Sequence, residues 1–217
     1  MAKKVRVELK WVVMTATLSL IALIALLKYN TGYFKDLIFT GAIVTILFLL
    51  YERLRMTPET YAAVCLAIIV HNLGAFGFYG NNPILPSIPY DVITHVMGIF
   101  AATLIAANFL SHYLKVRKDF VAKDIILLCV IFLVGLGIGS VVETMEFTGY
   151  LMWGAGEGFF QFGTGDYNGI SDCGKLTDIV GGGYFDTMED LIANMFGAAA
   201  AVILMGINFF VLKRELV

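Results

Sequence analysis

The stretch Tyr-Phe-Asp-Thr-Met-Glu-Asp-Leu-Ile-Ala-Asn-Met-Phe-Gly, residues 184–197, begins with acidic residues and leads into an apolar run that continues to Phe210. Asp186, Asp190 and Asn194 follow one another at intervals of four residues, so in a helix they share one face. Polar groups inside a membrane are costly unless they are paired, so such a stripe favours a functional site. We therefore expect this helix to form one wall of a polar site in a membrane bundle.

The composition is that of an integral membrane protein. Of 217 residues, 59% are hydrophobic and 15% are charged, whereas soluble domains carry about 25% charged residues. The net charge is -2 and basic residues occur only in short clusters, which excludes a nucleic-acid-binding surface. The three cysteines have no paired or metal-type spacing, which argues against a disulfide framework or a zinc ribbon. Membrane lipids are the partners that this composition indicates.

Six apolar segments, each close to the ~20 residues that a bilayer core requires, predict an all-α polytopic bundle of six transmembrane helices. The first follows a basic start without a small-residue cleavage site, so we interpret it as an uncleaved helix. The chain forms a single membrane domain over residues 1–217, with a long loop at 147–186. The predicted helices cover residues 11–27, 36–51, 60–79, 91–113, 124–146 and 187–212.

The basic residues predict the orientation of these helices. Six helices place the two termini and the turns at 52–59 and 114–123 on one side, together with all Lys and Arg except Lys28, Lys35 and Lys175. The positive-inside rule then predicts cytoplasmic termini in a multi-pass protein of the plasma membrane, with the long loop outside.

This orientation brings polar residues of three helices to one depth near the outer surface. The helix from residue 91 begins there, the helix to residue 146 ends there, and the last helix begins there. Gly135, Gly139 and Glu143 also share a helix face, and glycines at this spacing allow close helix packing. The converging residues are Asp91, His95, Glu143, Glu146, Asp186, Glu189, Asp190 and Asn194, and the helix 60–79 adds His71 and Asn72 in its outer half.

Two kinds of chemistry suit a histidine among carboxylates. Such a set can bind a divalent cation such as Mg²⁺, Mn²⁺, Fe²⁺ or Zn²⁺, and neighbouring carboxylates also suit proton relay. The predicted catalytic residues are His95, Glu143, Glu146, Asp190 and Asn194. The predicted metal ligands are His95, Glu143, Glu146, Asp186 and Asp190.

A structural interpretation competes for some of these residues. Acids at a helix start, such as Asp91 and Asp186, can cap free N–H groups. Glu143 and Glu146 close a predicted helix, where the dipole disfavours acids, so capping does not explain them. His71, in the helix 60–79, is more typical of a core histidine bonded to a carbonyl.

Three motifs carry a resemblance to a known family. Asp91-x-x-x-His95, Glu143-x-x-Glu146 and Asp190-x-x-x-Asn194-x-x-Gly197, in this order, resemble the VanZ-like integral membrane proteins. The pattern Asp186-Thr187-x-x-Asp190 and the Glu-x-x-Glu pair are closest to the YjdF-type branch of uncharacterised membrane proteins. The resemblance implies a place in the cell envelope and a link to glycopeptide resistance, and it implies no activity. Where the family typically has a lysine after the aspartate, this chain has Val92, and where it has a glutamine, this chain has Glu146. Both differences make the site more acidic, which favours a cation or proton role over binding an anionic headgroup.

Three functions remain open from the sequence. The first is an enzyme or lipid-modifying protein with a metal-dependent or acid–base site. The second is a proton- or cation-coupled transporter or a lipid-binding module. The third is a structural subunit of a membrane complex. Its three histidines are too few for a many-histidine di-iron site, and the chain contains no Walker-type nucleotide motif.

Overall fold

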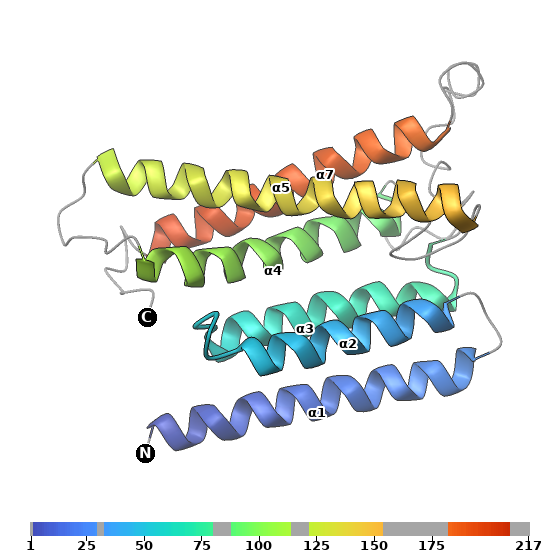
Figure 1. The fold of residues 1–217 in the computed structure, drawn as a ribbon, viewed down its shortest axis with the longest axis horizontal. Coiled ribbons are helices and arrows are strands. Elements are labelled where there is room, and N and C mark those ends of the chain that lie inside the picture. The colour runs from blue at the N-terminus through green and yellow to red at the C-terminus, as the bar shows by residue number, and fades with distance from the viewer. Residues whose placement is uncertain (1, 30–32, 80–87, 114–121, 154–181, 209–217) are drawn as a thin grey trace.

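A computed structural model of the chain describes residues 2–29, 33–79, 88–113, 122–153 and 182–208. Within these ranges the protein is built mainly from long helices (Figure 1). They are α1 (Ala2–Lys28), α2 (Phe34–Leu50), α3 (Pro58–Leu73) with the 3-10 turn η1 (Gly74–Phe76), α4 (Tyr90–Tyr113), α5 (Ala122–Trp153) and α7 (Gly182–Gly206).

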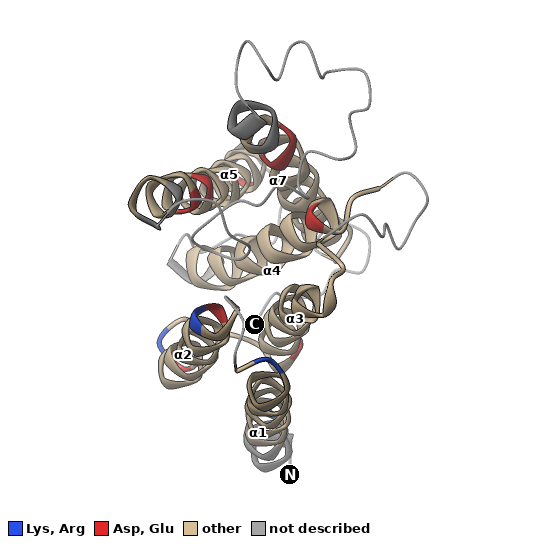
Figure 2. Ribbon diagram, turned by 90° about the vertical axis from the view of Figure 1, so that its right-hand side faces the viewer, with Lys and Arg blue, Asp and Glu red and all other residues tan. Residues whose placement is uncertain are grey.

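The helices form two groups of three. α3 packs against α1 and α2, α4 packs against α5 and α7, and α3 and α4 join the groups. Successive helices run in opposite directions (Figure 1), so α1, α3 and α5 end where α2, α4 and α7 begin. We call this the acidic end, because Figure 2, which looks onto it, shows Asp and Glu on α4, α5 and α7.

The prediction of a helical membrane bundle is confirmed at this level. Among the described residues, five helices are long and apolar enough to cross a membrane: α1, α3, α4, α5 and α7. α2 has 17 residues and extends about 26 Å at ~1.5 Å per residue, less than the ~30 Å of a hydrocarbon core. The count of six spans and the cytoplasmic termini therefore stay predictions.

Two helix boundaries differ from the predicted ones in a way that changes the site. α5 continues to Trp153, because apolar residues follow position 146 and no glycine occurs between Gly149 and Gly154. Glu143 and Glu146 therefore lie inside a helix, and the prediction that they lie at a helix C-terminus, where the dipole disfavours acids, was wrong.

The last helix also begins earlier than predicted. α7 starts at Gly182, so Asp186 follows its first turn and is not a cap. The predicted loop at 147–186 is shortened at both ends by these helices, and residues 154–181 lie outside the described ranges.

Candidate metal and acid-base site

Glycines bring the backbones of α4 and α7 close together. A Cβ atom added at Gly197 would collide with the carbonyl oxygen of Val96 and lie 3.0 Å from the backbone nitrogen of Phe100. A Cβ at Gly135 on α5 would lie 3.1 Å from the Cβ of Ala198. The close packing expected from the small-residue spacing is therefore present.

A third glycine makes room for a polar side chain. A Cβ added at Gly139 would lie 2.9 Å from Nδ2 of Asn194 and 3.0 Å from its Cβ and Cγ. Asn194 is only 1% exposed. Its amide Nδ2 donates to Oε1 of Glu143 at 3.1 Å, so the amide is held between α5 and α7.

His95 lies in the middle of the site. Its Nδ1 is 3.2 Å from Oδ1 of Asn194 and 3.3 Å from Oε1 of Glu143. Its Nε2 is 3.6 Å from Oδ1 of Asp91 and 3.7 Å from Oδ2 of Asp190. Three helices thus surround one imidazole ring with oxygen atoms.

Burial makes these contacts energetically important. The side chain of His95 is 8% exposed, that of Glu143 is 5% and that of Asp190 is 3%. Asp91 is more open, at 20%, because it lies in the first turn of α4. Buried carboxylates are costly unless positive charge or hydrogen bonds compensate them.

Four of these residues offer the geometry of a metal site. One ligand atom each from His95, Glu143, Glu146 and Asp190 can be chosen so that all four lie within 4.8 Å of one another. Two ligands at about 2.1 Å from one ion are at most about 4.2 Å apart. Side-chain movements of about 0.5 Å would therefore close the group around an ion.

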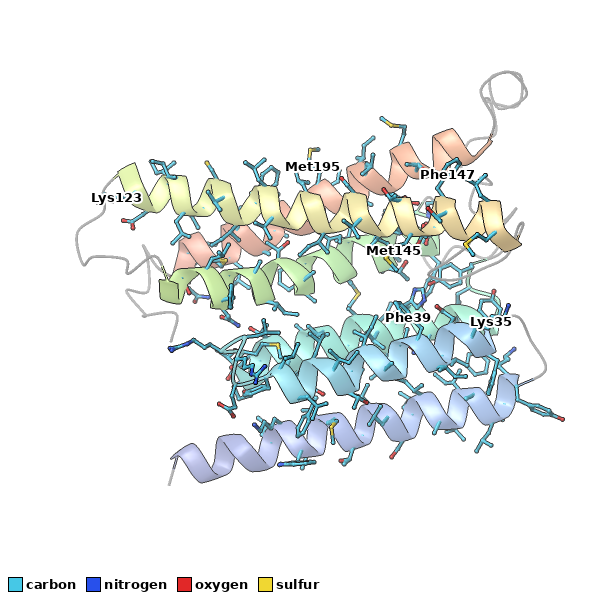
Figure 3. The ribbon with its side chains drawn as sticks, in the orientation of Figure 1. Lys35, Phe39, Lys123, Met145, Phe147 and Met195 are labelled. Carbon is cyan, nitrogen blue, oxygen red and sulfur yellow. The ribbon has the colours of Figure 1, made fainter. Side chains whose placement is uncertain are left out.

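The three helices do not supply enough positive charge of their own. Asp91, Glu143, Glu146 and Asp190 face one histidine, and the only lysine or arginine in α4, α5 and α7 is Lys123. Lys123 lies at the opposite end of α5 from Phe147 (Figure 3). The excess negative charge must therefore be balanced by protons, by a bound cation, or by groups from outside these helices.

The structure brings most of the predicted site residues together. His95, Glu143, Asp190 and Asn194 contact one another as described above, and Glu146 joins them in the ligand group. The side chain of Asp186 lies outside the described ones, so its predicted role as a ligand stays a prediction.

Two polar residues of α3 lie elsewhere. Asn72 donates from Nδ2 to Oγ1 of Thr40 at 3.0 Å. The ring of His71 contacts Asp36 and Tyr79 at 2.7 and 2.6 Å. From the sequence we expect the His71 ring to bond a carbonyl, and this expectation did not anticipate the Asp36 carboxylate or the Tyr79 hydroxyl.

These features define a helical membrane protein with a buried histidine and carboxylate cluster at one end. The chain belongs to the family described as "Predicted membrane protein (DUF2238)", whose model matches residues 9–209. No protein with a curated description and no solved structure matches the chain.

Proposed function

We propose that His95, Glu143, Glu146 and Asp190 bind a divalent cation and that this site performs metal-dependent or acid–base chemistry. One observation carries the proposal: four donor atoms of suitable type lie within 4.8 Å of one another. The acidic excess of α4, α5 and α7 supports it, because a divalent cation would offset much of the repulsion among buried carboxylates.

The donor set narrows the choice of ion. Three carboxylates and one imidazole suit Mg²⁺ or Mn²⁺ and, with fewer ligands, Fe²⁺ or Zn²⁺. Such an ion would supply Lewis acidity to a phosphate or carbonyl oxygen. Asn194 would orient Glu143 and His95 from the second coordination shell, as its contacts at 3.1 and 3.2 Å indicate.

The substrate class follows from the place of the site. The positive-inside rule predicts that the acidic end lies outside the plasma membrane, and the resemblance to the VanZ-like proteins, closest to the YjdF-type branch, implies the cell envelope. We therefore propose a lipid or another envelope component as the substrate.

Metal analysis of the purified protein tests this proposal. We expect wild-type protein in detergent to bind Mn²⁺ or Zn²⁺ in calorimetric titrations. Glu143→Gln and His95→Ala should each weaken binding by at least about 10–100-fold, since loss of second-shell partners alone has that effect. Glu189→Gln is the matched control. It also removes one negative charge, next to Asp190 in the sequence, but Glu189 is not one of the four proposed ligands, so metal binding should be retained.

Other results would favour the alternative functions. Absence of metal binding together with a proton flux in liposomes that Glu146→Gln abolishes would replace the proposal with a proton-coupled transporter. Wild-type behaviour of all the variants in both assays would leave only a structural role for the cluster.

A further inference from the structure

A second polar cluster lies at the acidic end, in the other group of helices. Nε2 of His71 on α3 is 2.7 Å from Oδ2 of Asp36 on α2. Nδ1 of the same ring is 2.6 Å from the hydroxyl of Tyr79. The two nitrogens of His71 are therefore both engaged, one by a carboxylate and one by a phenol.

The three side chains are held in place by their surroundings. A Cβ atom added at Gly74 would collide with the Tyr79 ring, so the glycine lets that ring lie directly on the backbone of η1. Tyr79 is 6% exposed and Asp36 is 6% exposed. The His71 side chain keeps 13% of its surface exposed.

The chemistry of the partners fixes the tautomer of a neutral His71 ring. A carboxylate only accepts hydrogen bonds, so Nε2 carries the hydrogen and Nδ1 accepts from the Tyr79 hydroxyl. Tyr79 follows Phe76, the last residue of a candidate span. Burial raises the pKa of the Tyr79 hydroxyl well above its ordinary value, and Asp91 and Asp36 raise it further, so Tyr79 keeps its proton and donates.

The same arrangement also satisfies a charged ring. The Tyr79 hydroxyl lies 3.2 Å from the carbonyl oxygen of His71, which is a second acceptor for its hydrogen. When Nδ1 carries a proton, it donates to the Tyr79 oxygen, and the Tyr79 hydrogen turns to that carbonyl. Both charge states of His71 thus keep a full set of hydrogen bonds.

We propose that Asp36, His71 and Tyr79 form a reversible proton-binding site, distinct from the His95 cluster. On proton uptake, the Tyr79 oxygen accepts the incoming proton, its original hydrogen passes to Nδ1 of His71, and Tyr79 remains neutral. The product is an imidazolium beside the Asp36 carboxylate, and release reverses these steps. The ligand is a proton, so this proposal does not require a metal at His95.

The elements packed near His71 carry other polar and charged groups. Thr94 of α4 donates a hydrogen bond to Oδ1 of Asp91 at 3.3 Å and also interacts with Tyr79. α1 contributes Lys28, whose ammonium group lies 4.8 Å from the centroid of the Phe76 ring. The titratable and charged groups near the proposed site are Lys28 of α1, Lys35 and Asp36 of α2, Tyr79, and Tyr90 and Asp91 of α4.

Nitrogen NMR of the full chain in lipid nanodiscs tests the proposal. The chain has three histidines, so ¹⁵N-histidine labelling gives three rings, and the His71 ring is the one whose signals disappear in His71→Gln. We expect a neutral ring protonated on Nε2 at high pH and an imidazolium at about pH 5, within the range where histidine changes charge. Circular dichroism should stay unchanged across this range.

Two variants separate a proton site from a merely structural contact. Asp36→Asn should lower the ratio of charged to neutral His71 at one pH by about tenfold or more, because the carboxylate that stabilises the cation is lost. Tyr79→Phe should leave a mixture of tautomers in the neutral ring, because Nδ1 loses its donor.

Tyr90→Phe is the matched control for these variants. The Tyr90 hydroxyl donates to the carbonyl oxygen of Val70, and its ring packs against Tyr79 at 5.4 Å between centroids. Its loss should leave the His71 signals unchanged. A His71 ring that stays neutral, or stays charged, from about pH 5 to pH 9 in a folded protein would overturn the proposal. An unchanged charge ratio in Asp36→Asn would do the same.

Discussion

Replacing Gly197 by alanine should separate α4 from α7 and disturb the candidate metal site. The new methyl group would meet the carbonyl oxygen of Val96 and lie 3.0 Å from the backbone nitrogen of Phe100. Backbone atoms of a helix cannot turn aside as a flexible side chain can. The helices must therefore move apart by about 0.5 Å or more, and overpacking of this kind costs about 1–3 kcal/mol.

Gly98→Ala provides a matched control on α4. Among the described residues, no atom outside the neighbouring backbone of α4 lies within 4 Å of a Cβ added at Gly98, and the residue is also in a helix. Alanine is favoured over glycine in a helix by about 1 kcal/mol, and this gain is common to both variants. Their difference in unfolding free energy therefore isolates the collision, and we expect Gly197→Ala to be less stable than Gly98→Ala by about 1–3 kcal/mol.

Denaturant unfolding in detergent, followed by circular dichroism, measures this difference. The same samples should show a second effect, because Asp190 on α7 and His95 on α4 would move apart. We expect Mn²⁺ affinity in Gly197→Ala to fall about tenfold or more, as for loss of second-shell support, and to stay at the wild-type value in Gly98→Ala. Equal stability of the two variants would refute the inference that backbone contact sets the helix spacing.

Further predictions concern the second shell, a helix cap and pH. Asn194→Ala should weaken Mn²⁺ binding by about 10–100-fold in calorimetry, because the amide that donates to Glu143 at 3.1 Å is lost; an unchanged affinity would exclude an orienting role. Thr57→Ala should destabilise the protein by about 1 kcal/mol, because the Thr57 hydroxyl accepts from the backbone N–H of Thr60 at the start of α3. Thr45→Ala, on an exposed helix surface, should have little effect in the same unfolding assay. Metal affinity should fall as the pH is lowered, because ligands must lose their protons to bind; a pH-independent affinity would contradict carboxylate and imidazole ligation.

The convergence of the candidate site could be predicted because it depends on helix period and direction. The spacing of Asp190 and Asn194 places both on one face, and alternating helix directions bring them to the level of His95 and Glu143. The contacts of 3.1–3.3 Å among His95, Glu143 and Asn194 agree with this reasoning. The roles of these residues in binding or catalysis stay predictions.

The pairing of His71 with Asp36 could not be predicted in the same way. Neither residue belongs to a periodic polar stripe, and their contact depends on which helices are neighbours, which no spacing within one helix reveals. Tyr79 adds a further difficulty, because it follows η1 and reaches back to His71 across a left-handed Gly77 with φ of 95°. The usable signal in the sequence was that a polar residue inside a membrane helix needs a polar partner on a neighbouring helix.

The length of α5 determines how deep the His95 cluster lies in a bilayer. Glu143 follows Lys123 by 20 residues in one continuous helix, a distance of about 30 Å at ~1.5 Å per residue. That distance equals the thickness of a typical hydrocarbon core, about 30 Å. With the Lys123 ammonium at one boundary of that core, Glu143 and the His95 imidazole beside it would lie at the opposite boundary. The lipid substrate proposed above could then reach the site by lateral diffusion, without leaving its own leaflet.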